Sequence, residues 1–279
     1  MLALDHVGFA CRDLDRILPI FRRVGFSPTE PRALEAVDPA TGQTRALGQT
    51  SAHIVFRDTY IELSAVPDPA TDNHLEPFLA RYEGLHILAL RDSDLETCHR
   101  QIRQHGFKIG DIQSAKRDIQ YGRRHGAARF RWFMLDKSAS PEGLLCVVDN
   151  LTPELVYQHE VMTHANGANR LTGVIICADD TDGARQRFGN ILGNGASLAN
   201  ASITIMTPDE LAEDYPGFMP PASPCLCGLE LRVADINDLA DLLEQSDVPY
   251  EQLDGDQICV YLPPPANGIL IFTQQTGAD

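Results

Sequence analysis

Long apolar runs are missing from this sequence of 279 residues. No stretch reaches the about 18 apolar residues that mark a membrane-spanning helix. The first residues, MLALDHVGFACRDL, carry Asp5, His6 and Arg12 where a signal peptide would need an uninterrupted apolar segment. We therefore expect a cytoplasmic protein without a membrane partner.

Basic charge is also scarce, because 23 Lys and Arg residues stand against 39 Asp and Glu residues and give a formal net charge of -16 at pH 7. Such a chain repels polyanions, and its only local basic cluster lies within residues 117–131. Nucleic acid is therefore not an expected partner. The seven cysteines form no CxxC pair, so we expect reduced, mostly buried thiols.

Two common catalytic motifs are absent as well. No glycine-rich loop ends in the Lys-Ser/Thr pair that holds phosphates, and no GxSxG nucleophile turn occurs. These absences argue against nucleotide-dependent chemistry and against a serine hydrolase.

What the sequence does contain is a fourfold repeat. Each copy reads as a strand, an acidic turn and a helix, and starts near residues 4, 84, 171 and 227. Short strand candidates follow each helix. They lie at residues 51–56 and 59–66, 128–135 and 143–148, 201–206, and 257–262 and 268–273. Gly25 and Gly106 follow the first two helices as expected for C-terminal caps.

The repeats fall into two pairs. We predict one domain over residues 1–150, a linker over residues 151–169 with a short helix after Thr152-Pro153, and a second, degenerate pair over residues 170–279. Proline-bearing breaks at residues 66–78 and 213–224 separate the repeats within each pair.

The segment LDHVGFACRDL together with YIELSAV resembles the opening module of the vicinal-oxygen-chelate superfamily, in its tandem glyoxalase-like group. This group includes glyoxalases, bleomycin-resistance proteins and extradiol dioxygenases. The resemblance implies an α+β fold of four βαβββ modules, paired into two curved mixed-sheet half-barrels. It also implies a cavity in each pair, with ligands on the first and last strands of each module.

Strand alternation indicates which side chains face that cavity, because residues two apart share a face. If apolar residues face the helix, His6 and Glu62 point into the cavity from the first module. In the second module the same rule selects His86 and places Cys146 in the position that Glu62 occupies.

Two imidazoles and one carboxylate form a ligand set for one divalent ion, Fe, Mn, Zn or Ni. We therefore predict a metal site of His6, Glu62 and His86, with Cys146 and His53 as candidate catalytic residues. The activity could be that of a lyase, an isomerase or a dioxygenase. The alternative is a metal-free protein that binds or sequesters small molecules, as in the bleomycin-resistance group, with the histidines in the core.

The basic cluster suggests how a small, oxygen-rich and possibly anionic substrate could be bound, since a buried arginine often pairs with an anion. The candidate substrate-binding residues are Tyr60, Arg117, Tyr121, Arg129 and Arg131. A solvated strand edge is the competing interpretation of these arginines. The second pair lacks matching ligands, and the sequence leaves a homodimer open.

Overall fold

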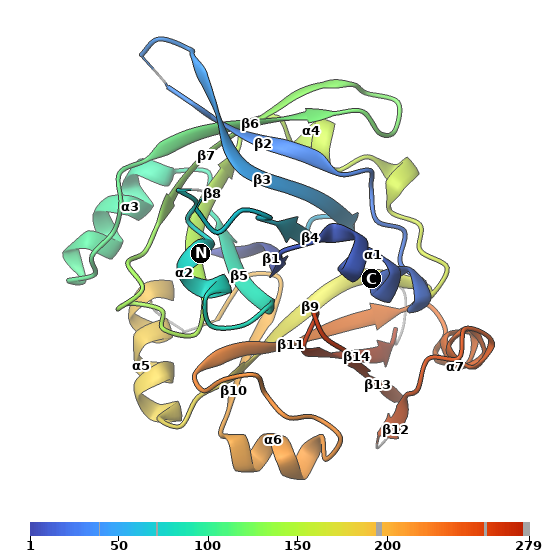
Figure 1. The fold of residues 1–279 in the computed structure, drawn as a ribbon. Helices are drawn as coiled ribbons and strands as arrows, with labels where there is room; N and C mark the ends of the chain where they lie inside the picture. Colours follow the sequence, from blue (N-terminus) through green and yellow to red (C-terminus); the bar gives the residue numbers. More distant parts are fainter. Residues whose placement is uncertain (39, 71, 194–196, 254–255, 276–279) are drawn as a thin grey trace.

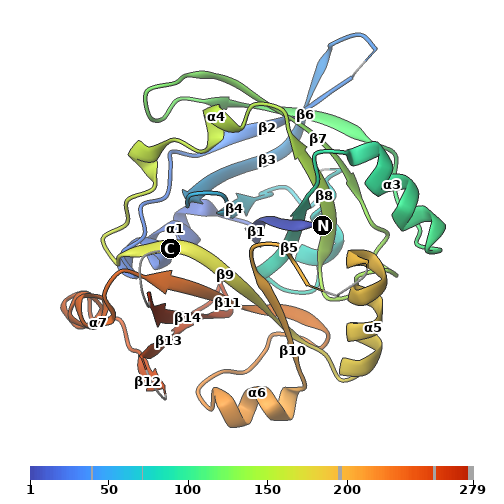
Figure 2. The ribbon, with the colours of Figure 1, turned by 180° about the vertical axis from the view of Figure 1, so that it is seen from behind.

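Two β-sheets and a few short helices make up the computed structural model, which describes residues 1–38, 40–70, 72–193, 197–253 and 256–275. The barrel occupies the upper half of Figure 1 and the second sheet the lower half, an arrangement that Figure 2 shows from behind. This is the α+β class predicted from the sequence.

The first module contains β1 (Ala3–Cys11), α1 (Leu14–Arg23), β2 (Arg32–Val37), β3 (Thr44–Val55) and β4 (Tyr60–Ala65). After the short α2 (Glu76–Leu79), the second contains β5 (Gly84–Arg91), α3 (Leu95–Gln104), β6 (Gln113–Ile119), β7 (Gly126–Met134) and β8 (Leu144–Asn150). Both modules therefore have the predicted βαβββ order.

Helix α1 illustrates why the sequence folds this way locally. Asp13 caps its N-terminus by accepting a hydrogen bond from the Asp15 amide. The helix buries one face, formed by Leu14, Ile17, Leu18 and Phe21 at helical spacing. Gly25 then adopts a left-handed φ of 88°, which ends the helix as predicted.

The two modules form a closed eight-stranded barrel in the order β1-β4-β3-β2-β6-β7-β8-β5. The modules meet twice, at the antiparallel pairs β1–β5 and β2–β6. The β2–β6 pair places Leu34 opposite Arg117 and turns the expected half-barrel into a closed one. This closure brings β6 into the wall of the site described below.

The second sheet runs in the order β10-β9-β11-β14-β13-β12. Its members are β9 (Ala168–Cys177), β10 (Ser202–Met206), β11 (Cys225–Val233), β12 (Glu251–Leu253), β13 (Gln257–Leu262) and β14 (Gly268–Gln274). Its helices are α5 (Thr181–Leu192), α6 (Pro208–Asp214) and α7 (Ile236–Gln245). The fourth module is complete, whereas the third keeps only β9, α5 and β10 before α6 among the described residues.

The segment predicted as a linker carries α4 (Pro153–Val156) and the single 3-10 turn η1 (His159–Val161). One apolar core joins the two halves, with Phe26 stacked on Phe272 of β14 at a ring separation of 6.2 Å. The predicted division at residues 151–169 stays a prediction. Within the described ranges no helix is long and apolar enough to cross a membrane.

Candidate functional site

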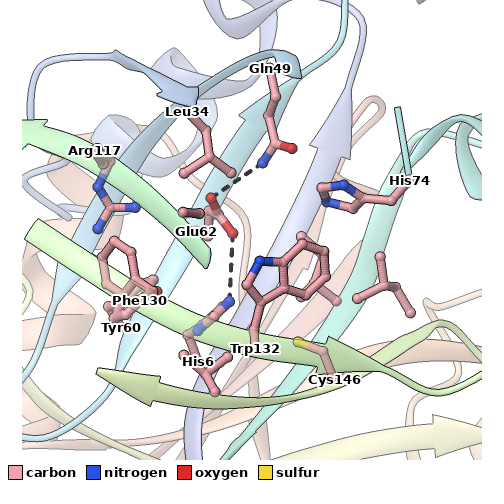
Figure 3. Close-up of a pocket in the computed structure, with 14 residues that line it drawn as sticks. His6, Leu34, Gln49, Tyr60, Glu62, His74, Arg117, Phe130, Trp132 and Cys146 are labelled. Atoms are coloured by element: carbon pink, nitrogen blue, oxygen red, sulfur yellow. Dashed lines mark hydrogen bonds and ion pairs between the residues drawn. The ribbon is translucent and has the colours of Figure 1, made fainter. Parts of the chain in front are cut away.

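A pocket with about 570 Å³ of empty space, its open mouth included, lies inside the barrel. Six polar side chains line the pocket, and Figure 3 shows them around the cavity, with Arg117 and His74 on opposite sides of Glu62. They are His6, Gln49, Tyr60, Glu62, His74 and Arg117. The rest of the wall is apolar, formed by Leu34, Ile87, Ala115, Phe130, Trp132, Leu144, Cys146 and Val148.

His6 on β1 is held by a carboxylate behind it. Its Nδ1 donates a hydrogen bond of 2.7 Å to Oδ1 of the buried Asp5, which leaves Nε2 facing the pocket. There Nε2 lies 3.6 Å from Oε2 of Glu62 on β4, too far for a hydrogen bond. Tyr60 stacks on the imidazole with ring centroids 4.4 Å apart. The ring is therefore fixed in both orientation and tautomer.

Glu62 is the only carboxylate on the wall of the pocket within the described chain. Burial raises its pKa, but His53, His6 and Arg117 outweigh burial and hold this pKa below its ordinary value. Gln49 on β3 donates to Oε1 at 3.5 Å and to Ser64 Oγ at 3.0 Å. Glu62 is therefore an ionised acceptor at neutral pH.

His53 on β3 is buried behind Glu62 and does not line the pocket. Its Nε2 accepts a hydrogen bond of 2.5 Å from Arg117 Nη1. Burial, and next the charge of Arg117, lower its pKa to about 4, so His53 is neutral at pH 7. Because Nε2 of His53 accepts this hydrogen bond, His53 holds Arg117 in position. The same nitrogen is then not available to accept a hydrogen bond from a substrate.

Arg117 enters the pocket from β6 with only 3% of its surface exposed. The rings of Tyr60 and Phe130 lie 5.9 and 5.3 Å from its guanidinium carbon. Its Nε and Nη2 have no hydrogen-bond partner. Arg117 is therefore a buried cation with one unsatisfied edge.

Two polar pocket residues, Gln49 and His74, escaped the sequence analysis. Gln49 shares a strand face with Ser51 and His53, but the predicted strand began only at residue 51, whereas β3 begins at Thr44. His74 lies in the proline-bearing segment after β4, where no periodic pattern exists. Its ring lies 5.3 Å from that of Trp132, and burial lowers its pKa to about 4.

The structure does not bring His86 to His6 and Glu62, which corrects the predicted strand face. His86 points away from the pocket, is fully buried, and its Nε2 donates to the Tyr82 carbonyl at 2.8 Å. Its ring packs on Tyr82 at 4.1 Å. The neighbouring Ile87 lines the pocket instead.

The register of the barrel gives the reason. His6 pairs with Ala89 and Gly8 with Ile87 across the β1–β5 contact. Strands β1 and β5 are the first strands of the two modules and pair with each other, so the pair His6–Ala89 is equivalent to the pair Ile87–Gly8. Ile87, rather than His86, is therefore the counterpart of His6. The helices give the same correspondence, because Leu14 begins α1 eight residues after His6 and Leu95 begins α3 eight residues after Ile87. The sequence alignment instead matched His6 with His86, one residue away, and so reversed the face.

Strand β7 shows the same reversal. Phe130 and Trp132 line the pocket in place of the predicted Arg129 and Arg131, while Phe133 packs on His99 of α3 at a ring separation of 4.9 Å. Arg131 pairs outside the barrel with Glu96 and Asp149 at 2.5 and 2.9 Å.

The two other predicted substrate-binding residues also lie away from the pocket wall. Arg129 is exposed on the outer side of β7. Tyr121 donates to the Val156 carbonyl at 3.1 Å and does not line the pocket. Of the five predicted residues, only Tyr60 and Arg117 therefore contact the cavity.

Cys146 on β8 lines the pocket on the predicted face, as the counterpart of Glu62. Burial, and then the charges of Asp5 and Glu62, raise the pKa of this thiol far above its ordinary value. A thiolate at this position is therefore strongly disfavoured.

Two of the polar side chains in the pocket, His6 and Glu62, are placed so that they could bind one metal ion. Within the described chain no group of three or more His, Cys, Asp or Glu side chains is placed to hold an ion. His6 Nε2 and Glu62 Oε2, however, are 3.6 Å apart without a hydrogen bond. Two donors with metal bonds of about 2.1 Å lie about 3.0–4.2 Å apart, so these two could share one ion. A carboxylate behind a ligating imidazole, as Asp5 stands behind His6, is common in metal sites.

Solved structures of the same overall fold include a hypothetical protein from Staphylococcus aureus, with a TM-score of 0.60, 11% identity, and coverage of 99% of this chain and 100% of that one. A triple mutant of 4-hydroxymandelate synthase from Streptomyces coelicolor has a TM-score of 0.58 and 14% identity, with 99% and 93% coverage. A xylose isomerase-like TIM barrel/4-hydroxyphenylpyruvate dioxygenase fusion protein has a TM-score of 0.59 and 11% identity. This chain is covered to 99% but spans only 49% of the fusion protein. At such identities the likeness shows the fold alone.

No curated protein matches the sequence. The family model for the glyoxalase-like domain, in contrast, matches residues 4–192, which is more than half of the chain and includes the whole barrel. This match confirms the resemblance seen in the sequence. The chain therefore belongs to the glyoxalase-like domain family.

Proposed function

We propose that the chain is a metal-dependent enzyme that acts on a small, oxygen-rich, anionic molecule inside the barrel. The observation that carries this proposal is the convergence of His6 Nε2 and Glu62 Oε2 at 3.6 Å, with Asp5 fixing the imidazole. His6 and Glu62 would hold one divalent ion, Fe, Mn, Zn or Ni. When bound, such an ion supplies a Lewis acid for an oxygen of the substrate.

The chain's own groups prepare the pocket for this chemistry. Asp5 accepts the Nδ1 proton of His6 and so keeps Nε2 available. Gln49 donates to Glu62, and the amide oxygen of Gln49 has no partner, so it can accept a hydrogen bond from a substrate hydroxyl. The apolar walls lower the effective dielectric constant beside the polar groups and so strengthen electrostatic contacts there.

The reaction belongs to one of two classes, a lyase or isomerase reaction or a dioxygenase reaction. Cys146 stands where a second carboxylate would serve as a proton-transfer base, and its thiol stays protonated. That substitution argues against a glyoxalase I type reaction and leaves the dioxygenase class as the first to test. An oxygen electrode with a catechol that carries a carboxylate as substrate separates the two classes, because only a dioxygenase consumes oxygen.

Metal titration tests the proposal itself. Purified protein freed of metal should bind about one Mn²⁺, Fe²⁺, Ni²⁺ or Zn²⁺ per chain in calorimetry, and Glu62→Gln should abolish that binding. Ser114→Ala is a suitable control, because Ser114 lies on β6 but does not line the pocket. If none of the four ions binds, or if Glu62→Gln binds as well as the wild type, the proposal is wrong.

A further inference from the structure

The unsatisfied edge of Arg117 has a definite shape. Nη1 donates to His53, while Nε and Nη2, which point the same way from the planar guanidinium, make no hydrogen bond of normal geometry. Burial raises the pKa of the Tyr121 phenol, and the guanidinium lies close enough to lower that pKa by a smaller amount. This edge presents two parallel N–H groups, the arrangement that matches the two oxygens of a carboxylate. A buried N–H group without an acceptor costs free energy. A ligand that enters the pocket and accepts hydrogen bonds from this edge would recover that free energy.

No protein carboxylate forms an ion pair with this guanidinium in the described part of the chain, although Glu62 lies on the same pocket wall. The guanidinium is instead flanked by the rings of Tyr60 and Phe130. Arg131 provides a contrast, because it has two carboxylate partners outside the barrel. Arg117 therefore keeps its charge for a ligand.

The charges of the pocket point to a ligand with one negative charge. This step rests on the proposed function, since it includes a divalent ion at His6 and Glu62. The carboxylates of Asp5 and Glu62 contribute two negative charges, while the ion and Arg117 contribute three positive charges. One monoanion would neutralise the excess.

The apolar part of the pocket wall indicates what kind of group the ligand carries beside its carboxylate. Ile87, Phe130, Trp132, Leu144 and Val148 line the pocket with apolar surface. Trp132 and Phe130 come from β7, two residues apart, so their rings lie on the same face. Such walls favour a flat apolar group and disfavour a sugar or another polyhydroxylated body.

We propose that Arg117 is the anion subsite of the pocket and that the ligand class is a monocarboxylate with a flat apolar body. The two carboxylate oxygens accept from Nε and Nη2 of Arg117, and the apolar body lies along Phe130 and Trp132. Because the metal and Arg117 attract the same anion, metal and carboxylate each raise the affinity for the other by the same factor.

Calorimetry with benzoate and its neutral isostere benzamide tests this proposal. Both probes are titrated into metal-free and Mn²⁺-loaded protein. Benzoate is expected to bind on the order of tenfold more tightly than benzamide, and Arg117→Gln is expected to remove that preference. Arg131→Gln is the matched control, because Arg131 is paired outside the barrel. Equal affinities for benzoate and benzamide in the wild type would overturn the proposal.

The outcomes separate this inference from the proposed function. If Mn²⁺ does not bind but benzoate is still preferred through Arg117, the metal is wrong and the anion subsite stands. If Mn²⁺ binds and benzoate is not preferred, the subsite is wrong and the metal centre stands. Should Arg117→Gln fail to fold, the comparison of benzoate with benzamide on the wild type and the benzoate affinity of Arg117→Lys decide the question.

Discussion

Replacing His86 tests whether this residue belongs to the core, as the structure indicates, or to a metal site. The side chain is fully buried, packs on Tyr82 and leaves Nδ1 without a partner. Burial lowers its pKa from 6.5 to about 4, while the hydrogen bond to the Tyr82 carbonyl raises it. Leucine is of similar volume, so His86→Leu removes the titrating group and keeps the packing.

The size of the effect follows from linkage. Between pH 6.5 and 4 the unfolded state binds a proton at residue 86 that the folded state does not bind, so the wild type loses stability as the pH falls. One pH unit corresponds to about 1.4 kcal/mol per proton, so the loss at pH 5 is about 2 kcal/mol. His86→Leu lacks this loss. The other buried histidines contribute equally to both proteins and cancel.

Urea unfolding at pH 7 and pH 5, followed by the fluorescence of the only tryptophan, Trp132, measures this difference. The free energy of unfolding of wild type relative to His86→Leu should fall by about 2 kcal/mol between pH 7 and pH 5. Parallel pH dependence in the two proteins would refute the interpretation of His86 as a neutral core residue.

Three further predictions concern the pocket wall. Ile87→His places an imidazole at the counterpart of His6 and should raise Mn²⁺ affinity by on the order of tenfold in calorimetry; an unchanged affinity would contradict the register argument. Cys146 should be alkylated by iodoacetamide at pH 8 more slowly than free cysteine, because burial raises its pKa; rapid labelling in mass spectrometry would argue for a thiolate. Gly8→Ala should lower the free energy of unfolding by about 1–3 kcal/mol, because an added Cβ would lie 2.6 Å from Ile87 Cδ1. Gly110→Ala is its control, with only the Met134 carbonyl oxygen near, at 3.8 Å.

Much of the fold could be predicted from the sequence, because each module repeats the same local signals. A strand, a capped helix and a glycine recur in order, and the structure confirms them in α1 with Asp13 and Gly25. The closed barrel could not be predicted, since the β2–β6 pair joins segments far apart in the chain. In the third module the single strand predicted at residues 201–206 is present as β10, whereas the full βαβββ module that the resemblance implied is not formed among the described residues.

The strand face that lines the pocket was predicted correctly only where the two faces of a strand differ in polarity. On β4, Glu62 is polar between apolar neighbours, and its side chain faces the pocket as expected. On β5 both faces are largely apolar, and on β7 the apolar face lines the pocket while the arginines lie outside, because the pocket itself has an apolar wall. Alternation then groups Phe130 with Trp132 but does not say which face is inside. His86 and Arg131 were assigned to the pocket for this reason.

We propose that His6 and Glu62 form the metal centre of the barrel and that His86 does not belong to it. Titration of metal-free protein with Mn²⁺, followed by the electron paramagnetic resonance signal of free Mn²⁺, tests this most directly. We predict about one bound ion per chain in the wild type and in His86→Leu, and loss of binding in His6→Ala. Loss of binding in His86→Leu, or undiminished binding in His6→Ala, would contradict the account.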